Sequence, residues 1–204
     1  MAGGWSLSTA GAVVPDKASL RRRMRQMRLV ADQKHGPEAA LQVLHHGLDG
    51  LSRLGIGEGV GVAGYWPIAT ELDIRPLLAR CHARGAVCAL PVVAADDHLA
   101  FRRWSPETIV EEGPRGTWHP PATAESVEPE VVFVPLLAVD DRGVRLGQGG
   151  GYYDRTLARL RAGRPVTAIG VGYAVQRVTS LPADGFDQPM DWVLTEAGLE
   201  RVAT

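Results

Sequence analysis

The chain has 204 residues, of which 45% are hydrophobic and 22% are charged. This is the composition of an ordinary globular protein, and it excludes a disordered or fibrous chain. The formal net charge is −1, so the average charge provides no strong field for nucleic acid or a membrane. No segment approaches the roughly 18 consecutive apolar residues of a membrane span. We therefore expect neither a nucleic-acid partner nor a membrane.

The N-terminal segment and the two cysteines bear on location. Residues 1–15 lack a basic run followed by a long apolar stretch, so they do not resemble a signal peptide. We interpret them as a mobile leader that ends at Pro15, and residues 16–204 as a single α/β catalytic domain. Cys81 and Cys88 fit no zinc-binding spacing and suit two reduced, partly buried thiols. We expect a cytoplasmic monomer.

Two helices are predicted first in chain order. Apolar residues follow a helical spacing over residues 17–33 and again over residues 37–54. They are Leu20, Met24, Met27 and Ala31 in the first helix, and Leu41, Leu44, Leu48 and Leu51 in the second. Arginines cover much of the remaining surface of the first helix. Pro37 near the start of the second helix and Gly55 just after its end are typical helix boundaries.

Short apolar runs alternate with helical patterns in the rest of the chain. Strands are predicted over residues 59–64, 86–90, 98–104 (an exposed strand), 131–135, 167–171 and, as the final strand, 192–195. Helices are predicted over residues 74–84 and 151–162, and a long proline-containing loop over residues 113–130. This alternation indicates crossover connections and a largely parallel sheet with helices on both faces.

A glycine-rich loop precedes the helix predicted over residues 151–162. Gly147, Gly149 and Gly151 permit positive φ angles and close approach of the backbone to a ligand. The first N–H groups of the helix lack partners and carry the positive end of its dipole, so phosphate is a natural ligand. The spacing matches neither a dinucleotide-binding fingerprint nor a Walker A loop. The structural alternative is a tight turn that requires small residues.

The context of this loop is more specific than the loop alone. Residues 145–155 read RLGQGGGYYDR, and Val132-Phe133-Val134-Pro135, Val139-Asp140 and Gly143 precede them. Together they resemble the signature of the 5-formyltetrahydrofolate cyclo-ligase family, also called methenyltetrahydrofolate synthetases. The resemblance runs over residues 17–196, and its other motifs are Lys17-x-x-Leu20-Arg21, Glu71-Leu72-Asp73, Gly170-Val171-Gly172-Tyr173, Gln176, Leu181-Pro182, Asp187 and Asp191-x-Val193-x-Thr195-Glu196. Val92 and Gly150 stand where the family often has basic residues.

The resemblance implies a fold and a reaction. The fold is a three-layer α/β sandwich of the NagB, RpiA and CoA-transferase kind. The reaction is the ATP- and Mg²⁺-dependent closure of 5-formyltetrahydrofolate to 5,10-methenyltetrahydrofolate, with release of ADP and phosphate. An N-formyl oxygen is a poor leaving group, and its phosphorylation activates the formyl carbon toward a neighbouring nitrogen. Positioning and charge neutralisation should dominate such catalysis.

The resemblance also implies the residues of the site. The expected ATP-binding residues are Lys17, Arg21, Arg145, Leu146, Gly147, Gln148, Gly149, Gly150, Gly151, Tyr152 and Tyr153. The expected substrate-binding residues are Trp66, Glu71 and Trp118, and the expected Mg²⁺ ligands are Asp154 and Asp191. Tyr152 and Tyr153 are the catalytic candidates, because one of their hydroxyls is expected to face the formyl group.

Several of these candidates have a plain structural alternative. Lys17 and Arg21 suit a solvated basic helix face, and Asp154 suits a charge that stabilises a helix N-terminus. The two tryptophans, Trp66 and Trp118, suit a hydrophobic core equally well.

Two other functions remain open from the sequence. One is an enzyme of another class on a similar fold, such as a sugar-phosphate isomerase or a CoA-transferase, which would need neither ATP nor Mg²⁺. The other is a non-catalytic nucleotide- or RNA-binding relative, for which the arginines between Arg21 and Arg28 are the best support.

Overall fold

The computed structural model of the protein describes residues 16–203 and contains three sheets. The seven strands of the largest are β1 (Gly61–Ala63), β2 (Val87–Val93), β3 (Leu99–Arg103), β6 (Val131–Pro135), β9 (Thr167–Val171), β11 (Trp192–Thr195) and β12 (Gly198–Arg201). The two smaller sheets are formed by β7 (Ala138–Asp140), β8 (Arg145–Leu146) and β10 (Arg177–Val178), and by β4 (Glu111–Glu112) and β5 (Trp118–His119). The helices are α1 (Lys17–Gly50), α2 (Arg75–Ala83) and α3 (Tyr152–Gly163), with short 3₁₀ helices η1 (Pro114–Gly116) and η2 (Ala174–Gln176).

The large sheet has the strand order β12-β11-β9-β6-β1-β2-β3. Its inner strands are parallel to one another, and the two edge strands are antiparallel to their neighbours. The predicted, largely parallel sheet is therefore confirmed. The predicted leader over residues 1–15 lies outside the described residues.

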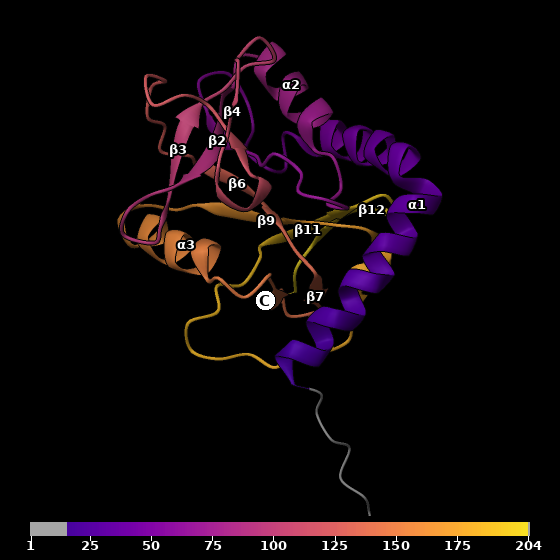
Figure 1. The fold of residues 1–204 in the computed structure, drawn as a ribbon. Coiled ribbons are helices and arrows are strands. Elements are labelled where there is room, and N and C mark those ends of the chain that lie inside the picture. Colours follow the sequence, from indigo (N-terminus) through magenta and orange to yellow (C-terminus); the bar gives the residue numbers. More distant parts are fainter. Residues whose placement is uncertain (1–15, 204) are drawn as a thin grey trace, which may run out of the picture.

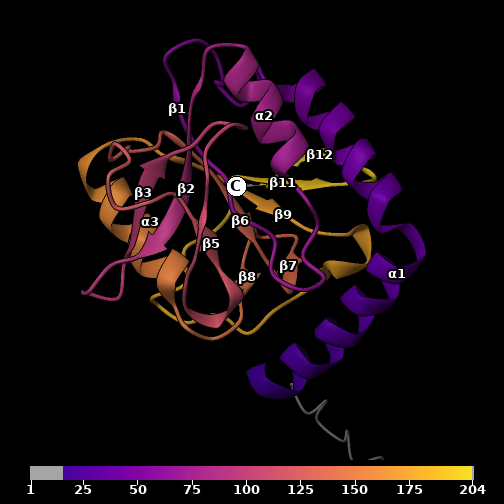
Figure 2. The ribbon, with the colours of Figure 1, turned by 45° about the horizontal axis from the view of Figure 1, so that its top comes forward.

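Helices cover both faces of this sheet, as predicted (Figures 1 and 2). The alternation of side chains along β6 shows how the two faces are filled. Phe133 packs into the cluster that contains Leu77 and Leu78 of α2, whereas Val132 and Val134 pack with Leu157 of α3. Both faces of a parallel sheet are normally buried in this way, which explains why its strands read as continuous apolar runs.

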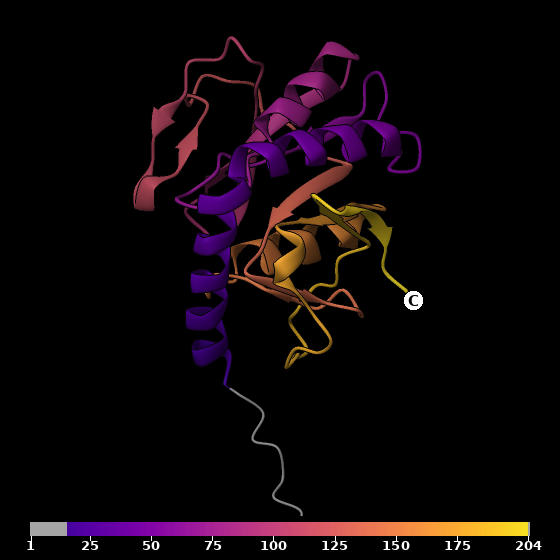
Figure 3. The same ribbon diagram turned by 90° about the vertical axis from the view of Figure 1, so that its right-hand side faces the viewer.

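Helix α1 differs from the prediction of two helices. It is one continuous helix with Pro37 inside it, and it changes direction sharply near its middle (Figure 3). An internal proline removes one N–H donor and crowds the preceding turn, so it bends the helix without necessarily ending it. Buried residues lie on both sides of the bend, among them Met24 before it and Val43 after it. The prediction was wrong because the local boundary signal of Pro37 is overridden by the packing of both halves.

Most other predicted elements are confirmed, and the predicted strand over residues 131–135 has the bounds of β6. The strand predicted over residues 192–195 is not the last one, because β12 follows it and pairs with it as an antiparallel edge. The predicted loop over residues 113–130 contains η1 and β5.

Cys81 and Cys88 are free, as predicted, and both are fully buried, whereas partial burial was predicted. Burial raises the pKa of Cys81 to about 11 and that of Cys88 to about 12, so both thiols stay protonated and inert.

Candidate functional site

A cavity of about 1250 Å³ opens at the carboxyl ends of the parallel strands. Its lining includes Pro91 and Val93 of β2, Pro135 at the end of β6, and Tyr65 and Trp66 just after β1. β1 and β6 are neighbours in the middle of the sheet. From β1 the chain continues outward to β2 in one direction, and from β6 it continues outward to β9 and β11 in the other. Open α/β sheets bind ligands at such a reversal of strand order, so topology alone points to this cavity.

The glycine-rich loop connects β8 to α3 and forms one wall of the cavity. Gly149 has a φ of 109° and Gly151 a φ of 69°, so both lie in the region that favours glycine. Gly151 is the N-cap of α3, and no side chain caps the helix there. The first N–H groups of α3 are therefore available to an anion in the cavity.

The basic first half of α1 contacts this loop. The Arg21 Nε–H donates to the carbonyl oxygen of Gly147 at 3.0 Å. Arg25 donates from Nε and Nη2 to the side-chain oxygen of Gln148, at 3.1 and 3.0 Å. The helix thus brings positive charge to the place where the loop offers its N–H groups. Arg21 was predicted at the site, and Arg25 was not.

Lys17, at the start of α1, reaches an acidic segment that was not predicted to belong to the site. Its Nζ lies 2.9 Å from Asp184 Oδ2 and 3.1 Å from Asp187 Oδ2, and all three residues line the cavity. The hydrogen bond to Asp184 raises the pKa of Lys17, so the ammonium group is held charged. A phosphate that binds Lys17 must share it with these two carboxylates.

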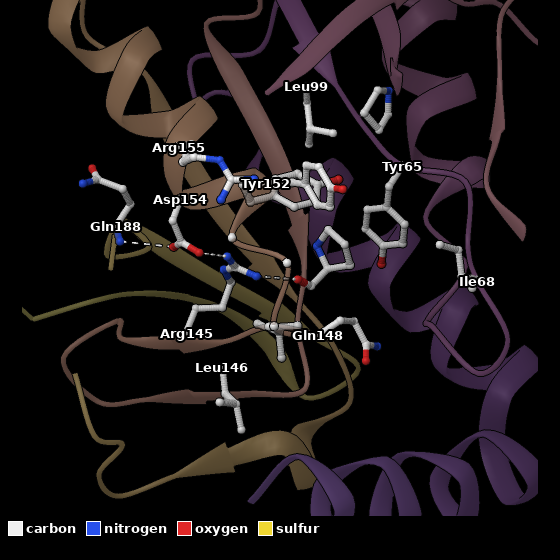
Figure 4. Close-up of a pocket in the computed structure, with 18 of the residues that line it drawn as sticks. Tyr65, Ile68, Leu99, Arg145, Leu146, Gln148, Tyr152, Asp154, Arg155 and Gln188 are labelled. Atoms are coloured by element: carbon white, nitrogen blue, oxygen red, sulfur yellow. Dashed lines mark hydrogen bonds and ion pairs between the residues drawn. The ribbon is translucent and has the colours of Figure 1, made fainter. Parts of the chain in front are cut away.

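Arg145 and Asp154, which flank the glycine-rich loop, form an ion pair in the wall of the cavity (Figure 4). Arg145 Nη2 lies 2.8 Å from Asp154 Oδ2, and the side chain of Arg145 is 5% exposed. Asp154 Oδ1 accepts a bond of 3.3 Å from the N–H of Gln188. The Nε of Arg145 is buried and has no hydrogen-bond partner among residues 16–203. Both predicted residues therefore line the cavity, but their charged groups are paired with each other.

Asp191, the other predicted metal ligand, lies away from this pair. It does not line the cavity within the part of the chain that the structure describes. Its carboxylate pairs with Arg161 at 2.8 Å and accepts from the N–H of Ala168 at 2.7 Å. The structure therefore does not bring Asp154 and Asp191 to a common point.

Aromatic side chains line the end of the cavity that faces β1 and β5. The ring centroids of Trp66 and Trp118 are 6.4 Å apart, with the planes tilted by 39°. The guanidinium of Arg75 lies 4.5 Å from the Trp66 ring centroid, a cation–π distance. Both predicted tryptophans thus face the cavity, and Trp118 is 38% exposed on the β4–β5 hairpin. Such surfaces suit a flat, conjugated ligand.

Glu71 is buried in the wall next to these rings. Its side chain is 7% exposed, and Oε2 accepts from the N–H of Ile68 at 3.1 Å. Burial raises the pKa of Glu71, although the Ile68 N–H and the nearby Arg28 act against this rise. Arg28 lines the cavity from α1 and was missed at the sequence level, where it read as part of an exposed basic face.

The two consecutive tyrosines at the start of α3 both line the cavity. The guanidinium of Arg155 lies 5.2 Å from the Tyr152 ring centroid. Burial, and then the charge of Glu71, raise the pKa of Tyr153 far above its ordinary value. The Tyr153 hydroxyl is therefore a hydrogen-bond donor or acceptor at neutral pH and not a base.

No group of three or more His, Cys, Asp or Glu side chains is arranged to hold a metal ion within residues 16–203. None of the helices in the same residues is both long and apolar enough to cross a membrane.

Comparisons with known sequences identify the family of the chain. The sequence profile of the 5-formyltetrahydrofolate cyclo-ligase family matches residues 13–196. The 5-formyltetrahydrofolate cyclo-ligase of Haemophilus influenzae is 29% identical over 182 residues, which are 85% of this chain and 94% of that protein. The 5-formyltetrahydrofolate cyclo-ligase of Mycolicibacterium smegmatis is 36% identical over 176 residues, which are 82% of this chain and 89% of that protein.

Solved structures give the same result. The NMR structure of Aquifex aeolicus 5,10-methenyltetrahydrofolate synthetase has a TM-score of 0.74 and 29% identity, covering 92% of this chain and 93% of that one. The 5,10-methenyltetrahydrofolate synthetase of Mycoplasma pneumoniae has a TM-score of 0.71 at 20% identity, which supports the fold alone. On the matched profile, its coverage and the shared fold, the chain belongs to the 5-formyltetrahydrofolate cyclo-ligase family.

Proposed function

We propose that the protein closes 5-formyltetrahydrofolate to 5,10-methenyltetrahydrofolate in a reaction that consumes ATP, requires Mg²⁺ and releases ADP and phosphate. The observation that carries the proposal is a single cavity with an anion-binding end and an aromatic, hydrogen-bonding end in a member of this family. Its volume of about 1250 Å³ exceeds the roughly 300–1,000 Å³ of a typical single-ligand pocket. Two substrates that react with each other need such a shared space.

The chemistry consists of two transfers. The γ-phosphoryl group of ATP passes to the formyl oxygen, which gives ADP and a phosphorylated formyl group. The neighbouring folate nitrogen then attacks the formyl carbon and loses its proton, and phosphate leaves with the former formyl oxygen. Since this chemistry demands little covalent help, the protein contributes mainly alignment and charge neutralisation.

The phosphate end of the cavity is formed by the glycine-rich loop and the first turn of α3. Residues 146–151 would bind ATP phosphates through backbone N–H groups, with Tyr152 and Tyr153 at the start of the helix. Lys17, Arg21 and Arg145 supply positive charge around them.

The folate end is formed by Trp66, Trp118 and Glu71. The two tryptophan rings would stack on the flat parts of the folate. A Glu71 carboxylate can accept hydrogen bonds from ring N–H and amino groups. The Tyr153 ring lies between the two ends, close enough to Glu71 for its pKa to respond to that charge. Tyr152 and Tyr153 are thus candidates to hold the formyl oxygen in line with the phosphoryl group.

Magnesium would enter with the nucleotide. Mg²⁺ is usually bound by one or two carboxylates, substrate phosphates and waters, so the nucleotide would bring most of its ligands. Asp154 is the best candidate, because it lies at the glycine-rich loop. Asp191 would join it only if the segment between Gln188 and Asp191 moves toward the cavity. Mg²⁺ supplies charge neutralisation of the transferring phosphoryl group.

The remaining expectations belong to the same proposal. A small folate substrate explains the presence of the cavity, so the proposal includes no nucleic-acid partner. We infer a cytoplasmic monomer with protonated, unpaired thiols. The non-catalytic RNA-binding alternative has the arginines of α1 as its support, but Arg21 and Arg25 bind the glycine-rich loop.

An absorbance assay tests the proposal. The methenyl product is a conjugated cation that absorbs at longer wavelength than 5-formyltetrahydrofolate. We expect the new band with ATP and Mg²⁺ together, and no band when either is omitted. A band that forms without ATP would indicate an enzyme of another class, and folded protein that gives no band under any condition would refute the proposed reaction.

A further inference from the structure

The acidic segment over residues 184–188 borders the cavity between the two helices that meet the glycine-rich loop. Near its start, Asp184 Oδ2 lies 2.9 Å from the Nζ of Lys17 on α1. At its end, the N–H of Gln188 donates to Asp154 Oδ1 on α3 at 3.3 Å. The segment therefore spans from α1 to α3, and all five of its residues line the cavity.

Phe186 stands in the middle of this segment with its ring in solvent. The residue is 86% exposed, although it lines the cavity. The backbone around it is fixed by two bonds within the segment. Asp184 Oδ1 accepts from the Phe186 N–H at 3.0 Å, and Asp187 Oδ2 accepts from the Asp184 N–H at 2.8 Å. An apolar ring is thus held at the rim of the cavity by a loop whose own carboxylates are already bonded.

Exposure alone does not single out this ring. Isolated apolar side chains are common on protein surfaces, and Ile109 is also 86% exposed. Ile109, however, lies outside the cavity lining that the described residues form. What distinguishes Phe186 is its place at the phosphate end of the cavity, between the two carboxylates that hold Lys17.

The two ends of the cavity decide in which direction a bound nucleotide extends. With its phosphates at the glycine-rich loop, the terminal phosphate must face the folate, which occupies the end with Trp66 and Trp118. The rest of the nucleotide must then extend away from these rings. Figure 4 shows that Gln188 and Tyr65 lie on opposite sides of the loop, so the acidic segment is on the side left for the nucleotide.

Aromatic surface on that side comes from Phe186. The other aromatic residues of the described cavity lining are Tyr65, Trp66, Trp118, Tyr152 and Tyr153. They lie just after β1, on the β4–β5 hairpin or at the start of α3, where the folate and its formyl group are proposed to bind. Phe186 is therefore not needed by the folate, and its free ring face is available to the base.

We propose that Phe186 stacks on the base of the bound nucleotide, so that the acidic segment forms a purine subsite at the outer end of the cavity. Stacking on an aromatic side chain uses the flat face that every base offers, and a purine offers more of it than a pyrimidine. The subsite therefore favours purine over pyrimidine triphosphates. The inference rests on the proposed function and deepens it, because it names the residue that holds the base of the phosphoryl donor.

Equilibrium binding tests the inference independently of turnover. The probes are ATP, CTP and inorganic tripolyphosphate, each with Mg²⁺, and the variants are Phe186→Ala and Phe186→Trp. Ile109→Ala is the matched control, because it removes an equally exposed apolar side chain outside the described cavity lining. We expect Phe186→Ala to weaken ATP binding about 10-fold, within the range for one stacked base, and to leave tripolyphosphate binding unchanged. Phe186→Trp should bind ATP at least as tightly as wild type, and the control should match wild type for all three probes.

The inference is overturned if Phe186→Ala binds ATP as tightly as wild type, or if wild type binds CTP or tripolyphosphate as tightly as ATP. It is also overturned if Phe186→Ala weakens tripolyphosphate as much as ATP, since the phosphate end and not the base would then be affected. Failure of the proposed reaction looks different. If ATP binding depends on Phe186 but wild type forms no methenyl product, the base subsite is correct and the proposed reaction is not.

Discussion

Asp154 is the carboxylate on which the proposed site depends most. It is the partner of Arg145, whose side chain is 5% exposed, and it lies beside the glycine-rich loop. In Asp154→Asn the guanidinium keeps its charge without its counter-ion, and any Mg²⁺ loses a carboxylate. We expect kcat/KM to fall about 10- to 100-fold, on the scale of one charge-assisted interaction. Mg²⁺ titrations should show that the variant needs more metal for half-maximal rate.

Asp191→Asn is the matched comparison for this change. Asp191 also pairs with an arginine, at 2.8 Å, but outside the described cavity lining. We expect its Mg²⁺ requirement to be close to that of wild type. An equal effect of the two substitutions would mean that Asp191 moves into the site during turnover, and an Asp154→Asn enzyme with unchanged kinetics would contradict the role given to Asp154.

Asp140 supports the site from a distance. Its fully buried carboxylate accepts from the N–H groups of Arg142, Val144 and Leu181 and from the Arg142 side chain. These bonds fix the turn between β7 and β8, and hence the position of Arg145. In Asp140→Asn an amide NH₂ would face these donors. We expect a loss of about 1–3 kcal/mol in the free energy of unfolding at neutral pH, measured by urea denaturation.

The same carboxylate predicts how stability depends on pH. Burial acts to raise the pKa of Asp140, but the bonds from Arg142, Leu181 and Val144 outweigh it and hold the pKa below its ordinary value of 3.8. A carboxyl group whose pKa is lower in the folded than in the unfolded protein stabilises the fold at pH values above its unfolded pKa. This contribution is lost as the pH falls through the folded pKa. Wild type should therefore lose more stability below about pH 4 than Asp140→Asn does. Parallel pH curves for the two proteins would contradict this.

At the scale of single elements, the glycine-rich loop makes the sharpest prediction. Gly151 has a φ of 69°, and a Cβ there would lie 2.6 Å from Arg155 Nη1. Gly151→Ala should cost about 1–2 kcal/mol from the left-handed backbone alone. The displaced N–H groups should also raise KM for ATP more than KM for the folate, which steady-state kinetics would measure.

Gly163→Ala is the control for this loop substitution. Gly163 ends α3, and a Cβ there would meet no atom within 4 Å. An alanine should be neutral or slightly stabilising, by up to about 1 kcal/mol, since alanine is the better helix former. If both alanine variants leave ATP saturation unchanged, the glycine-rich loop is only a tight turn.

The bend in α1 divides this helix into two parts with different tasks. The first half carries Lys17, Arg21 and Arg28 to the cavity, and the second half packs Ala39 and Val43 into the main core. A straight helix of this length would move one of the two halves away from its partners. The bend is therefore part of how the site is assembled.

At the scale of the whole molecule, the central architecture could be predicted from the sequence because local patterns determine its strands and helices. Each inner strand is a short apolar run between turn residues, and β6 has the predicted bounds. The edge strand β12 was missed because it is partly exposed and pairs only with β11. The continuity of α1 was missed because packing on both sides of Pro37 is a tertiary effect.

The same contrast applies to the site. The glycine-rich loop and its flanking motifs were recognisable because they are contiguous, and Lys17, Arg21, Trp66, Glu71, Trp118, Arg145 and Asp154 all line the cavity. Arg28 was missed because its neighbours on α1 are exposed, and only the fold shows which arginine is buried. Asp184 was missed, and Asp187 was identified only as a motif residue without a role, because a polar loop gives no local sign that it meets Lys17.

The central claim is that one cavity couples phosphoryl transfer from ATP to closure of the folate ring. Its most direct test is a parallel measurement of methenyl product and inorganic phosphate from the same reaction, with 5-formyltetrahydrofolate, ATP and Mg²⁺. We predict that the two products appear at equal rates, in a one-to-one ratio, and that no phosphate is released when the folate is omitted. Phosphate release that is independent of the folate, or methenyl product that forms without phosphate, would contradict the claim.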